Sequence, residues 1–170
     1  VLRRSGRGGT AAPGLVALQI DPEVVAKIAR RLPNGAVVVA GTNGKTTTAR
    51  MIADIIEASG LKVLHNRSGS NLARGVAAVF IEQSSPTGEP DAQIAVIESD
   101  EAALPEILRL VKPRLLVLNN LFRDQLDRYG ELDTVSRTWK AVFATLPATT
   151  RLIVDVDDPT LATITSDLAA

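Results

Sequence analysis

The run GTNGKTT, at residues 41–47, contains the residue types that hold phosphate groups. It lies between an apolar stretch and an amphipathic helical pattern, so it predicts a loop that joins a strand to a helix. Gly41 and Gly44 let the backbone turn tightly, and the free N–H groups of the first helical turn then point at one anion. Lys45 adds a positive charge for the β- and γ-phosphates. The run therefore predicts a phosphate loop.

A carboxylate farther along the chain can complete a metal site beside this loop. The hydroxyl of Thr46 or Thr47 is placed to bind a magnesium ion. Glu98 ends an apolar run that predicts a strand, and Mg²⁺ prefers hard oxygen ligands. Thr46 and Glu98 are therefore the predicted metal ligands. The alternatives are a solvated carboxylate at Glu98 and a helix cap at Asp100 or Glu101.

Other polar segments follow two further apolar runs. The segment NNLFRDQLDRYGE, at residues 119–131, offers amides and carboxylates that either bind a ligand or cap a loop. The segment DVDDP favours an Asx turn ahead of Pro159. The single histidine, His65, lies at a strand end with no partner visible in the sequence. Trp139 and Phe143, four residues apart, predict core contacts of a helix.

Strands and helices alternate along the chain. Short β-branched or leucine-rich runs predict strands at residues 36–41, 62–65, 93–99, 114–120 and 151–156. Helical patterns lie between them, at residues 45–59, 71–82, 101–112 and 132–146. Because the strands are apolar throughout, they predict an α/β fold, a parallel sheet with helices on both faces. Ligands bind at the carboxyl ends of such strands, so the polar loops should converge on one rim.

The chain divides into a short arm and one domain. Residues 1–34 are predicted to form a glycine-, arginine- and proline-rich amino-terminal arm and a helix that starts at Asp21 and Pro22. Residues 35–170 are predicted to form a single ATP-binding domain. A chain of 170 residues with 45% apolar composition can bury one ordinary core.

Composition excludes several function classes. The 19 basic and 19 acidic residues cancel, so no global field attracts nucleic acid or an anionic membrane. The absence of cysteine excludes disulfides, thiolate zinc sites and cysteine nucleophiles. No apolar run approaches the roughly 20 residues of a membrane span, and no export signal is visible at the start. Together with the use of ATP, these observations predict a cytoplasmic location.

Six segments in order resemble the Mur ligase family: GRGGTAAPG, GTNGKTT, NRSGSNLARG, IESDEA, NNLFRDQLDRYGE and VDDP. The resemblance covers nearly the whole chain, and NLFRDQLDRYGE is its most specific part. The family's phosphate loop has this pattern and not the strict Walker A, which explains Val39 where Walker A has glycine. Within the family, the chain is most similar to the branch that amidates lipid II.

The resemblance implies a ligase of peptidoglycan synthesis. ATP, with Mg²⁺, would phosphorylate the α-carboxylate of D-glutamate in the lipid II stem peptide. Ammonia from a glutamine amidotransferase partner, GatD, would then displace phosphate and leave D-isoglutamine, at the inner face of the membrane. Lys45 and Glu98 would have catalytic roles. The implied nucleotide contacts are Gly41, Thr42, Asn43, Gly44, Lys45, Thr46, Thr47, Asn71 and Asp155.

The chain departs from the family pattern at several points. Gln125 replaces a histidine metal ligand of other Mur ligases, and Asp155 replaces an asparagine that contacts adenine. Lys140 lies near the position of a carbamylated lysine in some members, in an ambiguous register. The zinc ribbon and the carboxyl-terminal ligase domain of the lipid II-amidating branch are absent from the 170 residues. The chain is therefore interpreted as an incomplete member that does not ligate alone.

Three alternatives remain open from the sequence. The first is another ATP-dependent amide ligase, such as an amino-acid-adding Mur enzyme or a folylpolyglutamate synthase. The second is a truncated nucleotide-binding scaffold without turnover. The third, an unrelated kinase or GTPase, is disfavoured by Val39 and by the lack of a base-recognition motif. Whether ammonia or an amino acid is the nucleophile depends on regions outside this sequence.

Overall fold

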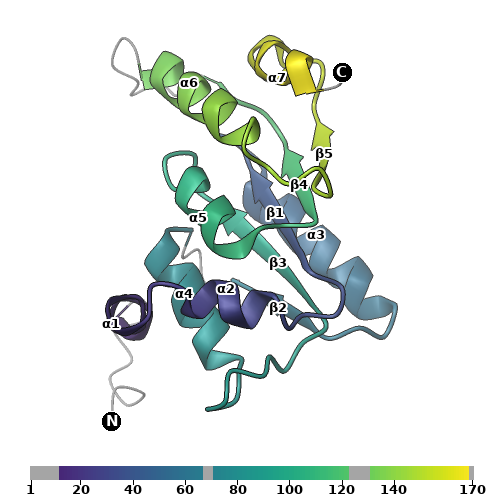
Figure 1. The fold of residues 1–170 in the computed structure, drawn as a ribbon. Coiled ribbons are helices and arrows are strands. Elements are labelled where there is room, and N and C mark those ends of the chain that lie inside the picture. The colour runs from purple at the N-terminus through teal and green to yellow at the C-terminus, as the bar shows by residue number, and fades with distance from the viewer. Residues whose placement is uncertain (1–11, 67–70, 123–130, 169–170) are drawn as a thin grey trace.

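A five-stranded parallel sheet forms the centre of the molecule (Figure 1). The computed structural model describes residues 12–66, 71–122 and 131–168. The strand order is β2-β3-β1-β4-β5, and every pairing is parallel. This confirms the predicted fold class. The strands are β1 (Ala36–Ala40), β2 (Val63–His65), β3 (Ile94–Ser99), β4 (Leu115–Leu118) and β5 (Arg151–Val154).

Helices cover both faces of the sheet, as predicted. On one face α3 packs its Ala49 and Ala53 against Val37, Val39 and Val96. The opposite face holds the larger core, to which α2, α4, α5, α6 and α7 all contribute. Figure 1 shows α3 behind the sheet and α2 and α5 in front of it. The helices are α1 (Ala12–Ile20), α2 (Val24–Ala29), α3 (Lys45–Ala58), α4 (Ala73–Glu82), α5 (Leu104–Val111), α6 (Glu131–Phe143) and α7 (Pro159–Thr165), followed by the 3₁₀ turn η2 (Ser166–Leu168).

The first described residues form a helix in place of the predicted arm. Residues 12–20 form α1, which the sequence did not predict, and α1 packs on α4. The contact is possible because Gly14 has no side chain: a Cβ there would lie 1.9 Å from the carbonyl oxygen of Arg74. Leu15 and Ile20 of α1 remain exposed. The prediction of an arm was therefore wrong from residue 12 onward, because Gly-Pro composition hid a helix that tertiary packing stabilises.

The helix predicted to start at Asp21 and Pro22 begins two residues later. Asp21 Oδ1 accepts a hydrogen bond of 3.0 Å from the Glu23 N–H, and Oδ2 accepts one of 2.7 Å from Lys27 Nζ. The Lys27 hydrogen bond holds the pKa of the Asp21 carboxyl below its usual value. Asp21 therefore stabilises the turn that leads into α2.

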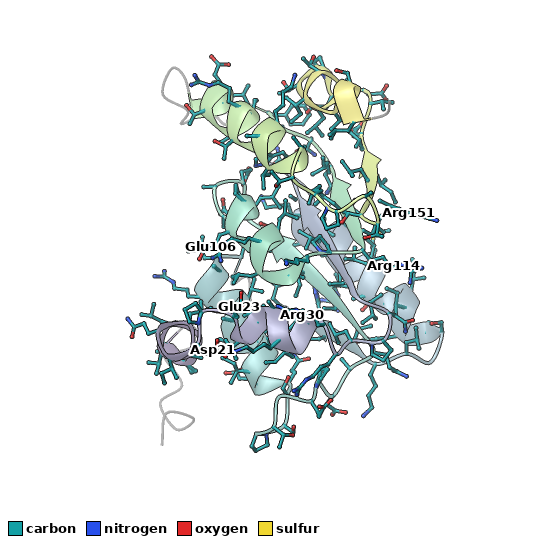
Figure 2. The ribbon with its side chains drawn as sticks, in the orientation of Figure 1. Asp21, Glu23, Arg30, Glu106, Arg114 and Arg151 are labelled. Carbon is teal, nitrogen blue, oxygen red and sulfur yellow. The ribbon has the colours of Figure 1, made fainter. Side chains whose placement is uncertain are left out.

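Several exposed charges lie at the amino ends of the strands or around α2. Figure 2 labels Arg114 and Arg151 at the amino ends of β4 and β5, and Asp21, Glu23 and Arg30 around α2. Arg30 and Glu23 form an exposed ion pair of 3.7 Å. Such pairs contribute little to stability. The polar groups at the opposite rim of the sheet are therefore the ones that define a site.

Candidate functional site

The loop between β1 and α3 has the geometry of a phosphate cradle. Gly41 and Gly44 adopt positive φ values of 144° and 77°, and Gly44 is the left-handed residue that precedes α3. A Cβ on Gly41 would lie 2.8 Å from the Asn120 carbonyl oxygen, so the loop passes close to the end of β4. No side chain of the described residues caps α3. Its first-turn N–H groups are therefore available to an anion.

Two asparagines at the end of β4 brace this loop. Asn120 Oδ1 accepts from the Asn43 N–H at 2.8 Å, and Asn120 Nδ2 donates to the Asn43 carbonyl at 3.1 Å. Asn119 Nδ2 donates to Thr48 Oγ1 at 3.0 Å. Thr42 adds a further link, because its Oγ1 accepts from the Phe122 N–H at 3.1 Å. The sequence left open whether these asparagines bind a ligand or stabilise a loop, and the structure shows them stabilising the loop.

Lys45 points back across the loop. Its Nζ lies 3.1 Å from the Thr42 carbonyl oxygen and 3.3 Å from Glu101 Oε2. The Lys45 and Glu101 side chains are only 13% and 21% exposed. Glu101 does not cap α5, whose N-cap residue Ala103 has no side-chain cap bond, so that alternative was wrong. Sequence reasoning missed the Lys45–Glu101 pair because the two residues are 56 positions apart.

Glu98 lies beside the first turn of α3. The residue is 2% exposed, and its Oε1 accepts from Thr46 Oγ1 at 2.9 Å and from Asn71 Nδ2 at 2.8 Å. The alternative of a solvated carboxylate was therefore wrong. Within the described part of the chain, Asn71 Oδ1 is the buried side-chain oxygen without a hydrogen-bond partner. The structure thus brings Thr46, Glu98 and Asn71 together from three separate segments.

This cluster fits a magnesium ion. A hydroxyl, a carboxylate and an unpartnered amide oxygen are all hard donors, the kind that Mg²⁺ prefers. Residues 12–66, 71–122 and 131–168 contain no group of three or more His, Cys, Asp or Glu side chains that could hold a metal. Magnesium sites often use one or two carboxylates and complete their shell with phosphate oxygens and water. Thr46 and Glu98 are the residues that would hold the ion.

The other predicted site residues lie farther from this cluster. Asp155 is exposed after β5, and its Oδ1 accepts from the Asp157 N–H at 3.0 Å, which is the predicted Asx turn. Thr47 is exposed in the first turn of α3, and Lys140 is exposed in the last turn of α6. Gln125 lies outside the described residues. A shallow groove connects the phosphate loop with Asp155, lined by Asn43, Gly44, Val117, Leu118, Asn119, Asn120, Ile153, Val154 and Asp155.

His65 and Trp139 are structural. His65 is buried, and its Nδ1 lies 2.7 Å from the Val96 carbonyl oxygen, so it has a partner that the sequence did not reveal. Trp139 and Phe143 are buried with ring centroids 5.8 Å apart, which confirms the predicted core contact. Trp139 Nε1 also donates to the Glu101 carbonyl at 3.0 Å. It therefore fixes the backbone of the residue that pairs with Lys45.

The sequence of the chain matches a known protein family. The model of the Mur ligase middle domain matches residues 39–170. The chain belongs to the Mur ligase family. This confirms the resemblance seen in the sequence motifs.

Two curated members of the Mur ligase family illustrate the relationship. The chain is 38% identical over 157 residues to a Staphylococcus aureus protein named "Lipid II isoglutaminyl synthase (glutamine-hydrolyzing) subunit MurT", covering 92% of this chain and 34% of that protein. It is 42% identical over 154 residues to the Streptococcus pneumoniae protein of the same name, covering 90% and 33%. The chain therefore spans about a third of the length of these relatives.

Solved Mur ligase structures share the fold. A MurF structure from Acinetobacter baumannii matches with a TM-score of 0.70 at 20% identity, over 90% of this chain and 32% of that one. A MurF ligase from Thermotoga maritima, in complex with ADP, matches with a TM-score of 0.63 at 18% identity, over 82% and 33%. Among the described residues, no helix is both long enough and apolar enough to cross a membrane.

Proposed function

We propose that this chain is the ATP-binding part of a ligase that amidates the α-carboxylate of D-glutamate in the lipid II stem peptide. The observation that carries the proposal is the convergence of Thr46, Glu98 and Asn71 beside the phosphate loop. The names of the two MurT relatives support the choice of substrate. GatD, a glutamine amidotransferase, is the proposed source of ammonia, and residues 35–170 are the proposed central domain of a longer protein.

The reaction has two steps. An oxygen of the D-glutamate carboxylate attacks the γ-phosphorus of ATP, and ADP leaves, which gives an acyl phosphate. Ammonia then attacks the acyl carbon, phosphate leaves, and the loss of a proton gives the amide. Both steps need charge neutralisation and positioning more than covalent help from the protein. The free N–H groups of α3 and the Lys45 ammonium would hold the β- and γ-phosphates.

Magnesium, when bound, would neutralise charge on the transferred phosphate. Thr46 and Glu98 would hold it, and the Asn71 amide would orient the Glu98 carboxylate through the 2.8 Å hydrogen bond. Asp155 would lie at the far end of the groove, where the base of the nucleotide is proposed to bind. The site would act at the cytoplasmic face of the membrane, where the lipid II head group is accessible.

Calorimetric titration of ATP, with and without Mg²⁺, tests the nucleotide site. We expect magnesium-dependent binding to the unsubstituted protein and a loss of at least about tenfold in affinity for Lys45→Ala. Glu98→Gln should remove the magnesium dependence and leave weak metal-free binding. Lys62→Ala is a matched control, because Lys62 is exposed and pairs with Asp91 away from the site. Equal losses in Lys45→Ala and Lys62→Ala would refute the proposed phosphate contact.

The choice of acceptor needs the full-length protein. Incubation with GatD, glutamine, ATP and lipid II should convert the D-glutamate carboxylate to an amide, detectable by mass spectrometry of the stem peptide. An added amino acid in place of ammonia would indicate another amide ligase of this family. Nucleotide binding without any product would favour the scaffold.

A further inference from the structure

The β2–β3 ladder ends before it reaches Glu98. The register pairs His65, the last residue of β2, with Val96, whereas β3 continues to Ser99. On its other side Glu98 is paired with Val39 of β1. The segment of β3 that carries the predicted metal ligand is therefore held by a backbone strand on one side only.

The side chain of Asn66 takes the place of the missing strand. Its Oδ1 accepts from the Glu98 N–H at 2.8 Å, and its Nδ2 donates to the Glu98 carbonyl at 2.9 Å. The residue is 1% exposed. One side-chain amide thus makes both of the bonds that the two peptide groups flanking one residue of a longer β2 would make. The next rung is made by the backbone, because the Asp100 N–H donates to the Asn71 carbonyl at 3.1 Å.

This arrangement fixes the backbone from which the carboxylate projects. Glu98 Oε1 meets Thr46 and Asn71 at 2.9 Å and 2.8 Å, so a small displacement of the Glu98 backbone would break both contacts. Glu98 is buried, and a buried N–H or C=O without a partner costs about 1–3 kcal/mol. Without the Asn66 amide, the two backbone groups of Glu98 would have to find other partners, and β3 would have to shift for them to do so.

We infer that Asn66 is a positioning residue for the magnesium ion that Glu98 is proposed to bind. This inference rests on the proposed function and adds a residue to it. Asn66 acts through the backbone of a metal ligand and touches neither the metal nor the nucleotide. Partners of this kind in metal sites typically contribute about 10- to 100-fold to metal affinity. The sequence alone did not point to Asn66.

The chain supplies a matched control at the opposite end of the same two strands. Gln93 Oε1 accepts from the Lys62 N–H at 2.7 Å, so Gln93 also links a side-chain amide to the backbone across β2 and β3. Gln93 immediately precedes β3, at the end remote from Glu98. Gln93→Ala therefore removes a bond of the same kind without touching the backbone of the metal ligand.

The experiment measures ADP binding by calorimetry as Mg²⁺ is titrated, together with the melting temperature. Asn66→Ala is expected to raise the Mg²⁺ midpoint, the Mg²⁺ concentration at which ADP binding is half-maximally enhanced, by about tenfold. Its metal-free ADP affinity should be unchanged, and Gln93→Ala should keep the unsubstituted midpoint. A lower melting temperature in Asn66→Ala with an unchanged Mg²⁺ midpoint would overturn the inference, because the role would then be structural alone.

A second variant guards against misfolding. Asn66→Asp keeps the acceptor for the Glu98 N–H and loses the donor to the Glu98 carbonyl, so its Mg²⁺ midpoint should also rise. A midpoint within twofold of the unsubstituted protein would count against the inference. If the unsubstituted protein itself shows no magnesium-dependent binding, both the proposed function and this inference are refuted. That result is distinct from magnesium-dependent binding that Asn66 does not affect.

Discussion

Replacing Glu101 with glutamine is expected to tighten nucleotide binding. The Lys45 ammonium is 3.3 Å from Glu101 Oε2, in a pair that is mostly shielded from solvent. A phosphate that binds in the loop must draw Lys45 away from this carboxylate or share it. Glutamine keeps the size of the side chain and removes the charge that competes with the phosphate.

The magnitude follows from the geometry of the pair. At 3.3 Å and an effective dielectric constant of about 20, the Coulomb attraction is about 5 kcal/mol. Most of this is offset by the loss of hydration, which is larger for a shielded pair, so the net value stays near the upper limit of about 1 kcal/mol measured for exposed pairs. We take about 1 kcal/mol as the net value, which corresponds to about fivefold in affinity.

The assay is calorimetric titration of ADP in the absence of Mg²⁺, so that the metal site does not contribute. Glu101→Gln should lower Kd about fivefold. Glu106→Gln is the control, because Glu106 is an exposed carboxylate of α5 (Figure 2) and the ion pair of Lys45 is with Glu101. Unchanged or weaker binding in Glu101→Gln, or an equal gain in Glu106→Gln, would refute the reasoning that Glu101 competes with phosphate for the lysine.

Three further substitutions test the supporting structure. Gly41→Ala should destabilise the protein by at least about 2 kcal/mol in urea unfolding, because its φ is 144° and the new Cβ would lie 2.8 Å from the Asn120 carbonyl oxygen. Gly14→Ala should separate α1 from α4, since the new Cβ would lie 1.9 Å from the Arg74 carbonyl oxygen. Limited proteolysis should then cleave within α1, and resistance of α1 to cleavage would contradict the packing. Asp158→Ala should cost about 2–3 kcal/mol in thermal melts, because Asp158 Oδ1 accepts from two N–H groups of α7 and Oδ2 accepts from the buried Leu121 N–H after β4. A loss below about 0.5 kcal/mol would argue against the cap.

The sheet and the phosphate loop could be predicted because their signals are local. Uninterrupted apolar runs between helical patterns indicate buried parallel strands. The glycines at 41 and 44 and the following lysine indicate an anion site without any knowledge of the rest of the fold. The place of Glu98 at the same rim as this loop was predictable from the same logic, because the ends of parallel strands meet at one edge of a sheet. Its role as a metal ligand stays a prediction.

The parts that were missed depend on contacts across the chain. The pairing of Lys45 with Glu101 and the Asn66 amide on Glu98 join segments 56 and 32 residues apart, and neither has a periodic pattern. Helix α1 was missed for a different reason. Gln19 is its one polar side chain, so its sequence shows little amphipathic period, and its packing on α4 uses the close approach that Gly14 permits.

The strand order has a consequence for how the protein is made. Strand β1 is central in the sheet, yet both of its neighbours, β3 and β4, come later in the chain. During synthesis β1 leaves the ribosome first and stays unpaired until about 60 to 80 further residues have followed it. The phosphate loop is completed only after β4, because Asn120, which holds Asn43 in place, follows that strand. A nascent chain that ends before β4 therefore contains the complete GTNGKTT motif but has no braced loop with which to bind a nucleotide.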